Sequence, residues 1–143
     1  MRKQPIAVAA ACLLLAACSA TPAPAGWQPK PGASGLWASA SGTQTYSYTR
    51  RSFGGSLQDL ASQEAVNVVL RNRGSHFIKS DVFKPCPGMA AVANFSYGND
   101  VIDEGFAVQS GQAVLVAYTR PKDSPVDPAA ENAMEKALCV AAL

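Results

Sequence analysis

The residues best suited to chemistry in this chain of 143 residues begin with its only histidine, His76. Any Ser-His-Asp or Cys-His arrangement would have to use this side chain. His76 directly follows Gly74 and Ser75 at the predicted end of a helix, where an exposed or edge-strand histidine is ordinary. The sequence therefore predicts no catalytic residue and no enzyme, with catalysis through His76 as the alternative.

A second candidate is the acidic group Asp100, Asp103 and Glu104, which comes after a Gly-Asn turn. Carboxylate oxygens are the ligands that a hard cation such as calcium prefers. The spacing lacks the regular ligand alternation of an EF-hand loop, so we interpret these residues as the polar side chains of a hairpin loop. No metal and no cofactor are predicted.

The N-terminus carries the most specific pattern, a basic start and an apolar run that ends in Leu15-Ala16-Ala17-Cys18. The pattern resembles the lipobox of bacterial lipoproteins, and it implies that residues 1–17 are a signal peptide and that Cys18 carries the lipid. The apolar run is shorter than the roughly 20 residues that a transmembrane helix needs. An ordinary signal peptide, with Cys18 nearby by chance, is the alternative.

A lipid on Cys18 would make a membrane the first partner of the protein, because two or three acyl chains anchor stably. Ser19 resembles an outer-membrane sorting signal. We therefore expect the cell envelope as location: the periplasmic face of the outer membrane in a host with two membranes, otherwise the outer face of the plasma membrane. Residues 18–35, rich in Pro, Ala and Gly, are predicted to form a linker, and residues 36–143 a single globular domain. Trp27 could lie at the membrane interface or dock on the domain.

The lipobox also changes the interpretation of the other cysteines and of the charge. With Cys12 in the signal peptide and Cys18 acylated, Cys86 and Cys139 remain in an oxidising compartment, which favours a disulfide. The chain-entropy model gives this bond about 4 kcal/mol at most. A redox or metal role is the rival, but the sequence has no Cys-x-x-Cys motif.

The mature chain is close to neutral. Of 12 basic residues, two lie in the signal peptide, which leaves 10 against 10 acidic residues. Such a balance predicts no nucleic-acid partner. A local patch of basic residues, from among Arg50, Arg51, Arg71, Arg73 and Lys79, and a solvated surface for the same charges both stay open.

The hydrophobic pattern of the domain alternates between the periods of strands and helices. A helix begins after the capping residue Ser56, with Asp59 three residues later, and a second helix opens at Asp127-Pro128. Strands are predicted at 43–53, 76–82, 89–97, 104–109 and 112–120, with the helices at 57–73 and from 128 onward. This order predicts an α+β domain, an antiparallel sheet with a long helix after the first strand and a C-terminal helix.

Four segments of the domain resemble a known family. They are Trp37 ahead of a Tyr-rich strand, the helix opening Ser56 to Ala61, the hairpin end Ala117 to Pro121, and the closing helix. Together they are similar to the bacterial PsbP-like domain, an α-β-α sandwich. The resemblance covers residues 36–143. It implies an extrinsic, membrane-associated accessory or assembly protein without known catalytic residues.

Aromatic side chains supply the candidate binding surface. Tyr46 and Tyr48 alternate on one predicted strand, and Phe95 and Tyr97 alternate on another. If the strands are neighbours, the four rings could form a surface for a protein or a peptidoglycan-like ligand. The alternative is that they are half of the core.

The sequence thus predicts a lipid-anchored envelope protein with a non-enzymatic binding or assembly-accessory domain, and an envelope protein as its partner. One alternative is an envelope enzyme or small-ligand carrier with a pocket between sheet and helix. Another is an anchored structural protein without a specific ligand.

Overall fold

The computed structural model describes residues 23–86 and 90–142. The predicted signal peptide 1–17, Cys18 and the first residues of the linker lie outside the described residues. Among the residues that are described, no helix is both long and apolar enough to cross a bilayer.

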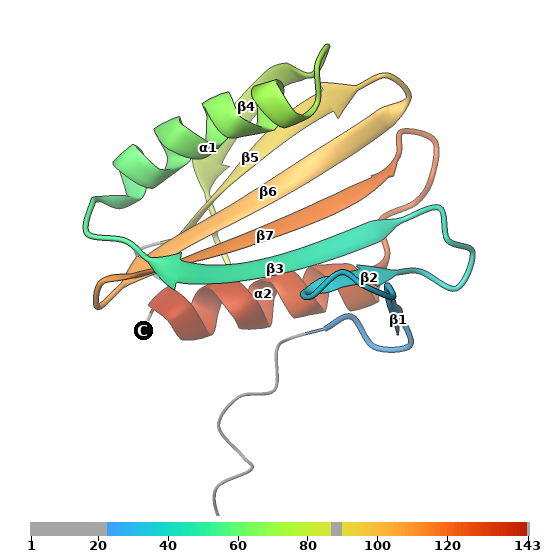
Figure 1. The fold of residues 1–143 in the computed structure, drawn as a ribbon, viewed down its shortest axis with the longest axis horizontal. Helices are drawn as coiled ribbons and strands as arrows, with labels where there is room; N and C mark the ends of the chain where they lie inside the picture. Colours follow the sequence, from blue (N-terminus) through green and yellow to red (C-terminus); the bar gives the residue numbers. More distant parts are fainter. Residues whose placement is uncertain (1–22, 87–89, 143) are drawn as a thin grey trace, which may run out of the picture.

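The described residues form one antiparallel sheet with a helix on each face (Figure 1). The strands lie in the order β1-β2-β3-β7-β6-β5-β4. The elements are β1 (Gln28–Pro29), β2 (Leu36–Ala38), β3 (Thr45–Ser52), α1 (Leu57–Arg71), β4 (His76–Val82), β5 (Ala90–Tyr97), β6 (Asp100–Gln109), β7 (Gln112–Pro121) and α2 (Pro128–Ala142). The predicted α+β class is confirmed.

Local sequence signals explain where the main elements begin and turn. Ser56 caps α1 through the predicted capping box, because its hydroxyl accepts from the Asp59 amide at 3.1 Å and Asp59 accepts from the Ser56 amide at 2.9 Å. Ser110 and Gly111 join β6 to β7, both with positive φ, as a tight turn between antiparallel strands requires. The predicted hairpin between these strands is confirmed.

The structure corrects the predicted position of the acidic group. Strand β6 begins at Asp100, four residues before the predicted start, and it pairs with β7 as far as Pro121. Asp100, Asp103 and Glu104 are therefore strand residues, and their interpretation as a hairpin loop is wrong. Side chains alternate along a strand, so Asp103 and Glu104 point to opposite faces of the sheet.

The folded domain also begins before the predicted boundary at residue 36. Trp27 is buried, its indole N–H donates to Asp127 Oδ2 at 3.0 Å, and its ring contacts Tyr118 edge-on at 6.1 Å between centroids. The next two residues form β1 and pair with Trp37 and Ala38. Strand β1 lies within the predicted linker and could not be recognised there, because a two-residue strand is too short to produce a hydrophobic period.

The two faces of the sheet have separate hydrophobic cores. The α2 side packs Tyr46, Val116 and Tyr118 against Leu138, and Gly105 lets the helix approach closely because a Cβ there would lie 2.6 Å from Leu138 Cδ1. The α1 side packs mainly around Leu60, Phe95 and Phe106. Cys86 and Cys139 form the predicted disulfide, with their Cα atoms 4.9 Å apart, and this bond ties the loop before β5 to α2.

Candidate functional site

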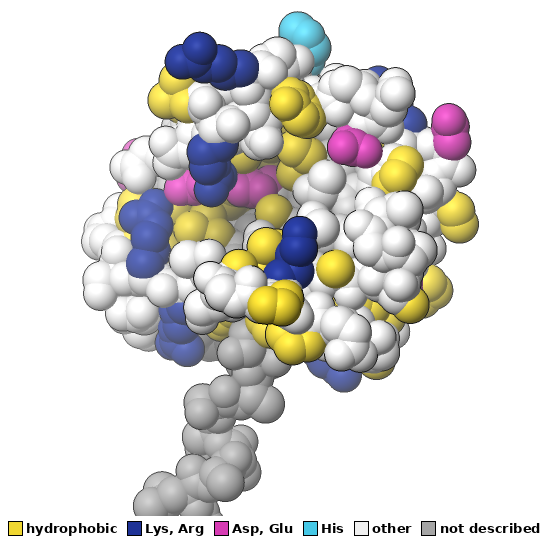
Figure 2. Space-filling model, turned by 45° about the vertical axis from the view of Figure 1, so that its right-hand side comes forward, with side chains coloured by type: hydrophobic (Ala, Val, Ile, Leu, Met, Phe, Trp, Pro, Cys, Tyr) yellow, Lys and Arg dark blue, Asp and Glu magenta, His cyan; other side chains and the backbone are white. Residues whose placement is uncertain are grey.

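The α1 face of the sheet is only partly covered. Helix α1 packs on β4, β5 and β6, and it leaves β7 and β3 open on this side. An open groove of about 980 Å³ lies between the helix and these strands. Figure 2 shows the hollow, with acidic side chains inside it, hydrophobic side chains on its floor and basic side chains beside it. This groove is the candidate binding site.

Two buried carboxylates belong to the charged part of the groove wall, which also includes Asp100. Glu64 comes from α1 and is 5% exposed, and Glu104 comes from β6 and is 4% exposed. Their positions follow from the periods of their elements. Glu64 lies between Leu60 and Val68 on the buried stripe of the helix, while Glu104 takes its alternate place on the inner face of the strand.

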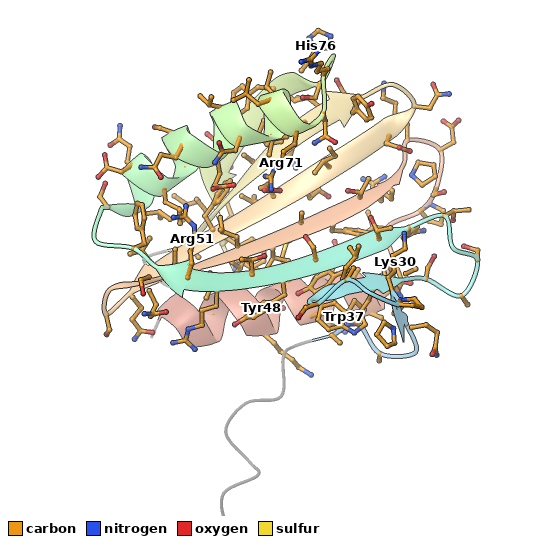
Figure 3. The ribbon with its side chains drawn as sticks, in the orientation of Figure 1. Lys30, Trp37, Tyr48, Arg51, Arg71 and His76 are labelled. Carbon is orange, nitrogen blue, oxygen red and sulfur yellow. A yellow bond between two sulfur atoms is a disulfide. The ribbon has the colours of Figure 1, made fainter. Side chains whose placement is uncertain are left out.

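Two arginines neutralise these carboxylates from opposite sides of the groove. Arg51 on β3 contacts Glu64 Oε1 at 3.3 Å, and Arg71 on α1 contacts Glu64 Oε2 at 3.3 Å. Arg71 also contacts Glu104 Oε1 at 3.4 Å, so its guanidinium links the two carboxylates. Figure 3 shows both arginine side chains in the space between α1 and the sheet. The ion pairs join the helix to strands β3 and β6.

Glu104 is the less completely neutralised carboxylate. Burial raises its pKa to about 7, although the nearby Arg71 charge lowers it, and Glu64 raises it further. The strand residues opposite it are Ala93 on β5 and Ala117 on β7, neither of which can donate a side-chain hydrogen bond. The neutral and charged forms of Glu104 are therefore both populated near neutral pH.

The rest of the groove combines hydroxyl groups with apolar side chains. Strand β3 contributes Ser47 and Thr49, and β7 contributes Leu115 and Thr119. The β3 and β7 residues are neighbours in register, since Ser47 pairs with Ala117 and Thr49 with Leu115. This surface can accept or donate hydrogen bonds along an extended ligand while its apolar atoms contact the chain.

The structure does not bring the predicted aromatic surface together. Tyr46 and Phe95 are buried in the two separate cores on opposite sides of the sheet. Tyr48 packs half-buried against the α2-side core, whereas Tyr97 is 40% exposed at the groove. The prediction of a shared binding surface for these four residues is wrong, because the strands that carry the two pairs are separated by β7 and β6.

The other predicted chemistry also lies elsewhere. His76 is exposed on β4, away from Arg51 and Arg71 (Figure 3). The possible basic patch is divided, because Arg50 and Arg51 are consecutive on β3 and point to opposite faces. Only Arg51 and Arg71 of that set line the groove.

Sequence reasoning missed the two carboxylates that matter most for this site. Each interrupts an apolar pattern: Glu64 lies in the stripe of α1, and Glu104 lies between Ile102 and Phe106 on the inner face of β6. A charged residue at a position that the period assigns to the core is expensive to bury, and buried charges are usually paired. That signal was present in the sequence.

Comparison with known proteins bears on the fold. The solution structure of cyanobacterial PsbP (CyanoP) from Synechocystis sp. PCC 6803 superposes with a TM-score of 0.53 over 71% of this chain and 73% of that chain. The domain has a PsbP-like fold. The two sequences are 12% identical, so the likeness extends to the fold alone. No family model matches the chain, and no curated protein matches its sequence significantly.

Proposed function

We propose that this chain is a lipid-anchored envelope protein whose PsbP-like domain binds another envelope component through the groove, without catalysing a reaction. The observation that carries the proposal is the open half of the α1 face, where buried carboxylates and exposed arginines lie together. Exposed apolar side chains also occur on β4, at Phe77, Ile78 and Val82, but this strand lies at the edge of the sheet and does not line the groove. A binding role fits a groove that combines these charges with an open sheet surface.

The energetic cost of the groove charges supports a binding role. Replacing a buried ion pair by well-packed apolar residues is often neutral or stabilising by about 1–4 kcal/mol, because desolvation offsets the attraction. Glu64 and Glu104 occupy positions that the helix and strand periods assign to apolar residues. Perturbed ionisable groups in a cleft are typical of functional sites. Stability alone does not account for this arrangement.

The short segment between Cys18 and the folded domain supports a role close to a membrane. Trp27 lies nine positions after Cys18 in the sequence, a distance of at most about 32 Å when the chain is fully extended. Trp27 is fixed by its hydrogen bond to Asp127 and its contact with Tyr118. A domain tethered through Cys18 would thus stay within a few nanometres of the lipid surface, and its partner would be in the membrane or next to it.

A small-ligand carrier is the second candidate function. The groove lies between sheet and helix, and its volume of about 980 Å³ is at the upper end of small-molecule sites, which occupy roughly 300–1,000 Å³. The chain's histidine does not join the acidic residues there, since His76 lies away from the groove. The groove thus supports binding of a small molecule more than a histidine-dependent reaction.

Two measurements on the full chain test the proposal separately. For the anchor, Cys18→Ala should move the protein from the membrane fraction to the soluble fraction of fractionated cells. A variant that remained in the membrane fraction would contradict lipid anchoring.

For the groove, the substitution Thr49→Trp places a large ring on an exposed position of the groove strand. Affinity capture from crosslinked cells should recover a partner with the wild-type chain and lose it with Thr49→Trp. Glu135→Trp, on the exposed side of α2, is the matched control and should retain the partner. Equal recovery with all three chains would show that the groove is not the binding site.

A further inference from the structure

We infer that the groove recognises an oxyanion, the carboxylate or phosphate group of its ligand, through Arg51 and Arg71. The inference rests on the proposed function, binding in the groove, and it specifies the chemical group of the ligand that the groove recognises. It depends on how the two guanidinium groups are held, on which of their N–H groups are unused, and on the balance of charge around them.

Glu64 positions both arginines. Its Oε1 accepts from Arg51 at 3.3 Å and from the Asn67 amide at 3.1 Å, and its Oε2 accepts from Arg71 at 3.3 Å. The three donors come from β3 and from two successive turns of α1. Because one buried carboxylate holds both guanidinium groups, their separation across the groove is set before a ligand arrives, which reduces the entropy lost on binding.

Both guanidinium groups keep unused donors. Arg51 uses one Nη2 contact and lies over the Phe53 ring at 5.4 Å, while Arg71 uses Nη2 and donates from Nε to the Asn67 carbonyl at 3.3 Å. Within the described residues, the Nη1 group of each has no acceptor. The side chains are 38% and 60% exposed, so a ligand can reach them. The planar donor fork of arginine matches carboxylate and phosphate oxygens.

The accessibility of the groove charges favours an anion over a cation. The groups that face Glu104 are Glu64 and Arg71 on α1, with Arg51 opposite on β3, and the adjacent strand residues Ala93 and Ala117 carry no charge. Asp100 also lines the groove, so the preference comes from accessibility and not from net charge. The arginine side chains are 38% and 60% exposed, whereas Glu64 and Glu104 are buried. A cation would have to pass the exposed arginines to reach a buried carboxylate that Arg71 already contacts.

The surface beside the arginines suits the remainder of such a ligand. Ser47, Thr49 and Thr119 lie along β3 and β7 next to the apolar Leu115. A chain that extends from the oxyanion along these strands would meet hydroxyl groups and apolar atoms in turn. The arginines would fix one end of the ligand, and the strands would bind its length.

The experiment is an NMR titration of the full chain in non-ionic detergent at pH 6.5, followed at the arginine Nε–H signals. The probes are N-acetyl-alanyl-alanine with a free carboxylate, the same dipeptide as its amide, and inorganic phosphate. The carboxylate, phosphate or both should shift the Arg51 and Arg71 signals saturably, and the amide should not. Comparing the dipeptide carboxylate with phosphate shows which oxyanion the groove prefers.

Variants that remove one charge each assign the binding. Arg51→Gln and Arg71→Gln should each weaken binding about 10-fold, as expected for the loss of a charge-assisted contact. Arg50→Gln makes the same charge change on the opposite face of β3 and should leave binding unchanged. Arg51 is partly exposed, so its variant tests the inference even if Arg71→Gln impairs folding.

Two results would overturn the inference. One is the absence of saturable shifts with both oxyanions at 20 mM. The other is equal weakening by Arg50→Gln and Arg51→Gln, which would indicate non-specific attraction. If partner capture is still lost with Thr49→Trp in either case, the groove remains the binding site and only the oxyanion assignment fails.

Discussion

The two faces of the sheet differ in how far their helices cover them. On the α2 side, the helix packs on β5, β6 and β7, and Trp27 and Trp37 extend the apolar layer beside Tyr46 on β3. On the α1 side, the helix lies over β4, β5 and β6, and no other element of residues 23–86 and 90–142 covers β3 and β7. The same strands therefore contribute a closed core on one side and a charged groove on the other.

This difference separates stability from binding. The α2 side contains the disulfide and the closest helix-to-sheet contact, between Gly105 and Leu138. The open part of the α1 side contains ion pairs with buried carboxylates. Their net contribution to stability is small, because the cost of desolvating the charges offsets much of their attraction. Substitutions on the α2 side should lower stability without a specific effect on ligand binding. Substitutions of the groove residues should weaken ligand binding with a smaller loss of stability.

The largest expected effect is loss of the disulfide on the closed side. The double substitution Cys86→Ser and Cys139→Ser should lower the free energy of unfolding by about 4 kcal/mol, from the entropy that the reduced unfolded chain regains. Urea denaturation with the full chain measures this change. Partner capture by the fraction that remains folded should be unchanged. A loss below about 1 kcal/mol would contradict the role assigned to this bond.

A matched pair of leucines compares the faces directly. Leu138→Ala removes a fully buried side chain from the α2 core and should cost about 3 kcal/mol, from lost burial and the cavity left behind. Leu115→Ala removes a half-buried side chain from the groove and should cost about 1 kcal/mol, because solvent already reaches it. Equal losses in thermal or urea unfolding would mean that the groove is part of the closed core.

Glu104 should make stability depend on pH. Its pKa is about 7 in the folded protein and lower when the chain is unfolded, so the folded state binds the proton more tightly. Its contribution is fully present below the unfolded pKa and is lost as pH rises through about 7. Glu104→Gln should remove this dependence and raise stability at pH 8 by up to about 3 kcal/mol.

Urea unfolding of wild-type and Glu104→Gln chains at pH 5 and pH 8 measures the effect. A gap between the two chains that is wider at pH 8 agrees with the raised pKa. The same gap at both pH values would indicate that Glu104 is already satisfied by Arg71 and is not destabilised by burial.

Two buried tyrosines should differ, and one of them has the smallest expected effect. Tyr118 donates to Gln44 Oε1 and accepts from the Asp127 amide at 2.9 Å, so Tyr118→Phe should cost about 1–2 kcal/mol by leaving these groups unpaired. The Tyr46 hydroxyl is buried without a hydrogen-bond partner in the described part of the chain. Tyr46→Phe should therefore leave stability unchanged or raise it slightly. A large loss in thermal unfolding of Tyr46→Phe would be incompatible with this packing.

The sequence was sufficient for the parts of the fold that repeat a clear period. Local patterns predict the capping box of α1 and the turn at Ser110 and Gly111. They also predict the order of the five longer strands along the chain. Strands β1 and β2 have two and three residues, too few for a period to be recognised. Their pairing depends on the contact of Trp27 with Asp127 and Tyr118, which are about a hundred residues away.

The site was harder to predict than the fold because it depends on which strands helix α1 leaves uncovered. Tyr46 and Phe95 have side chains suited to a binding surface, but the strand order places them in different cores. Glu64 and Glu104 look like isolated charges in apolar segments until α1 brings them to the same arginine. The disulfide could be predicted because the predicted signal peptide and lipid site left only two of the four cysteines to pair.

Photo-crosslinking in intact cells tests the central claim, that the groove binds the partner, most directly. A photoreactive amino acid replaces Thr49 in the groove or Glu135 on the exposed side of α2, one position per full-length chain. We predict a discrete crosslinked species from position 49 and none from position 135. Crosslinking from position 135 alone, with none from position 49, would contradict the account.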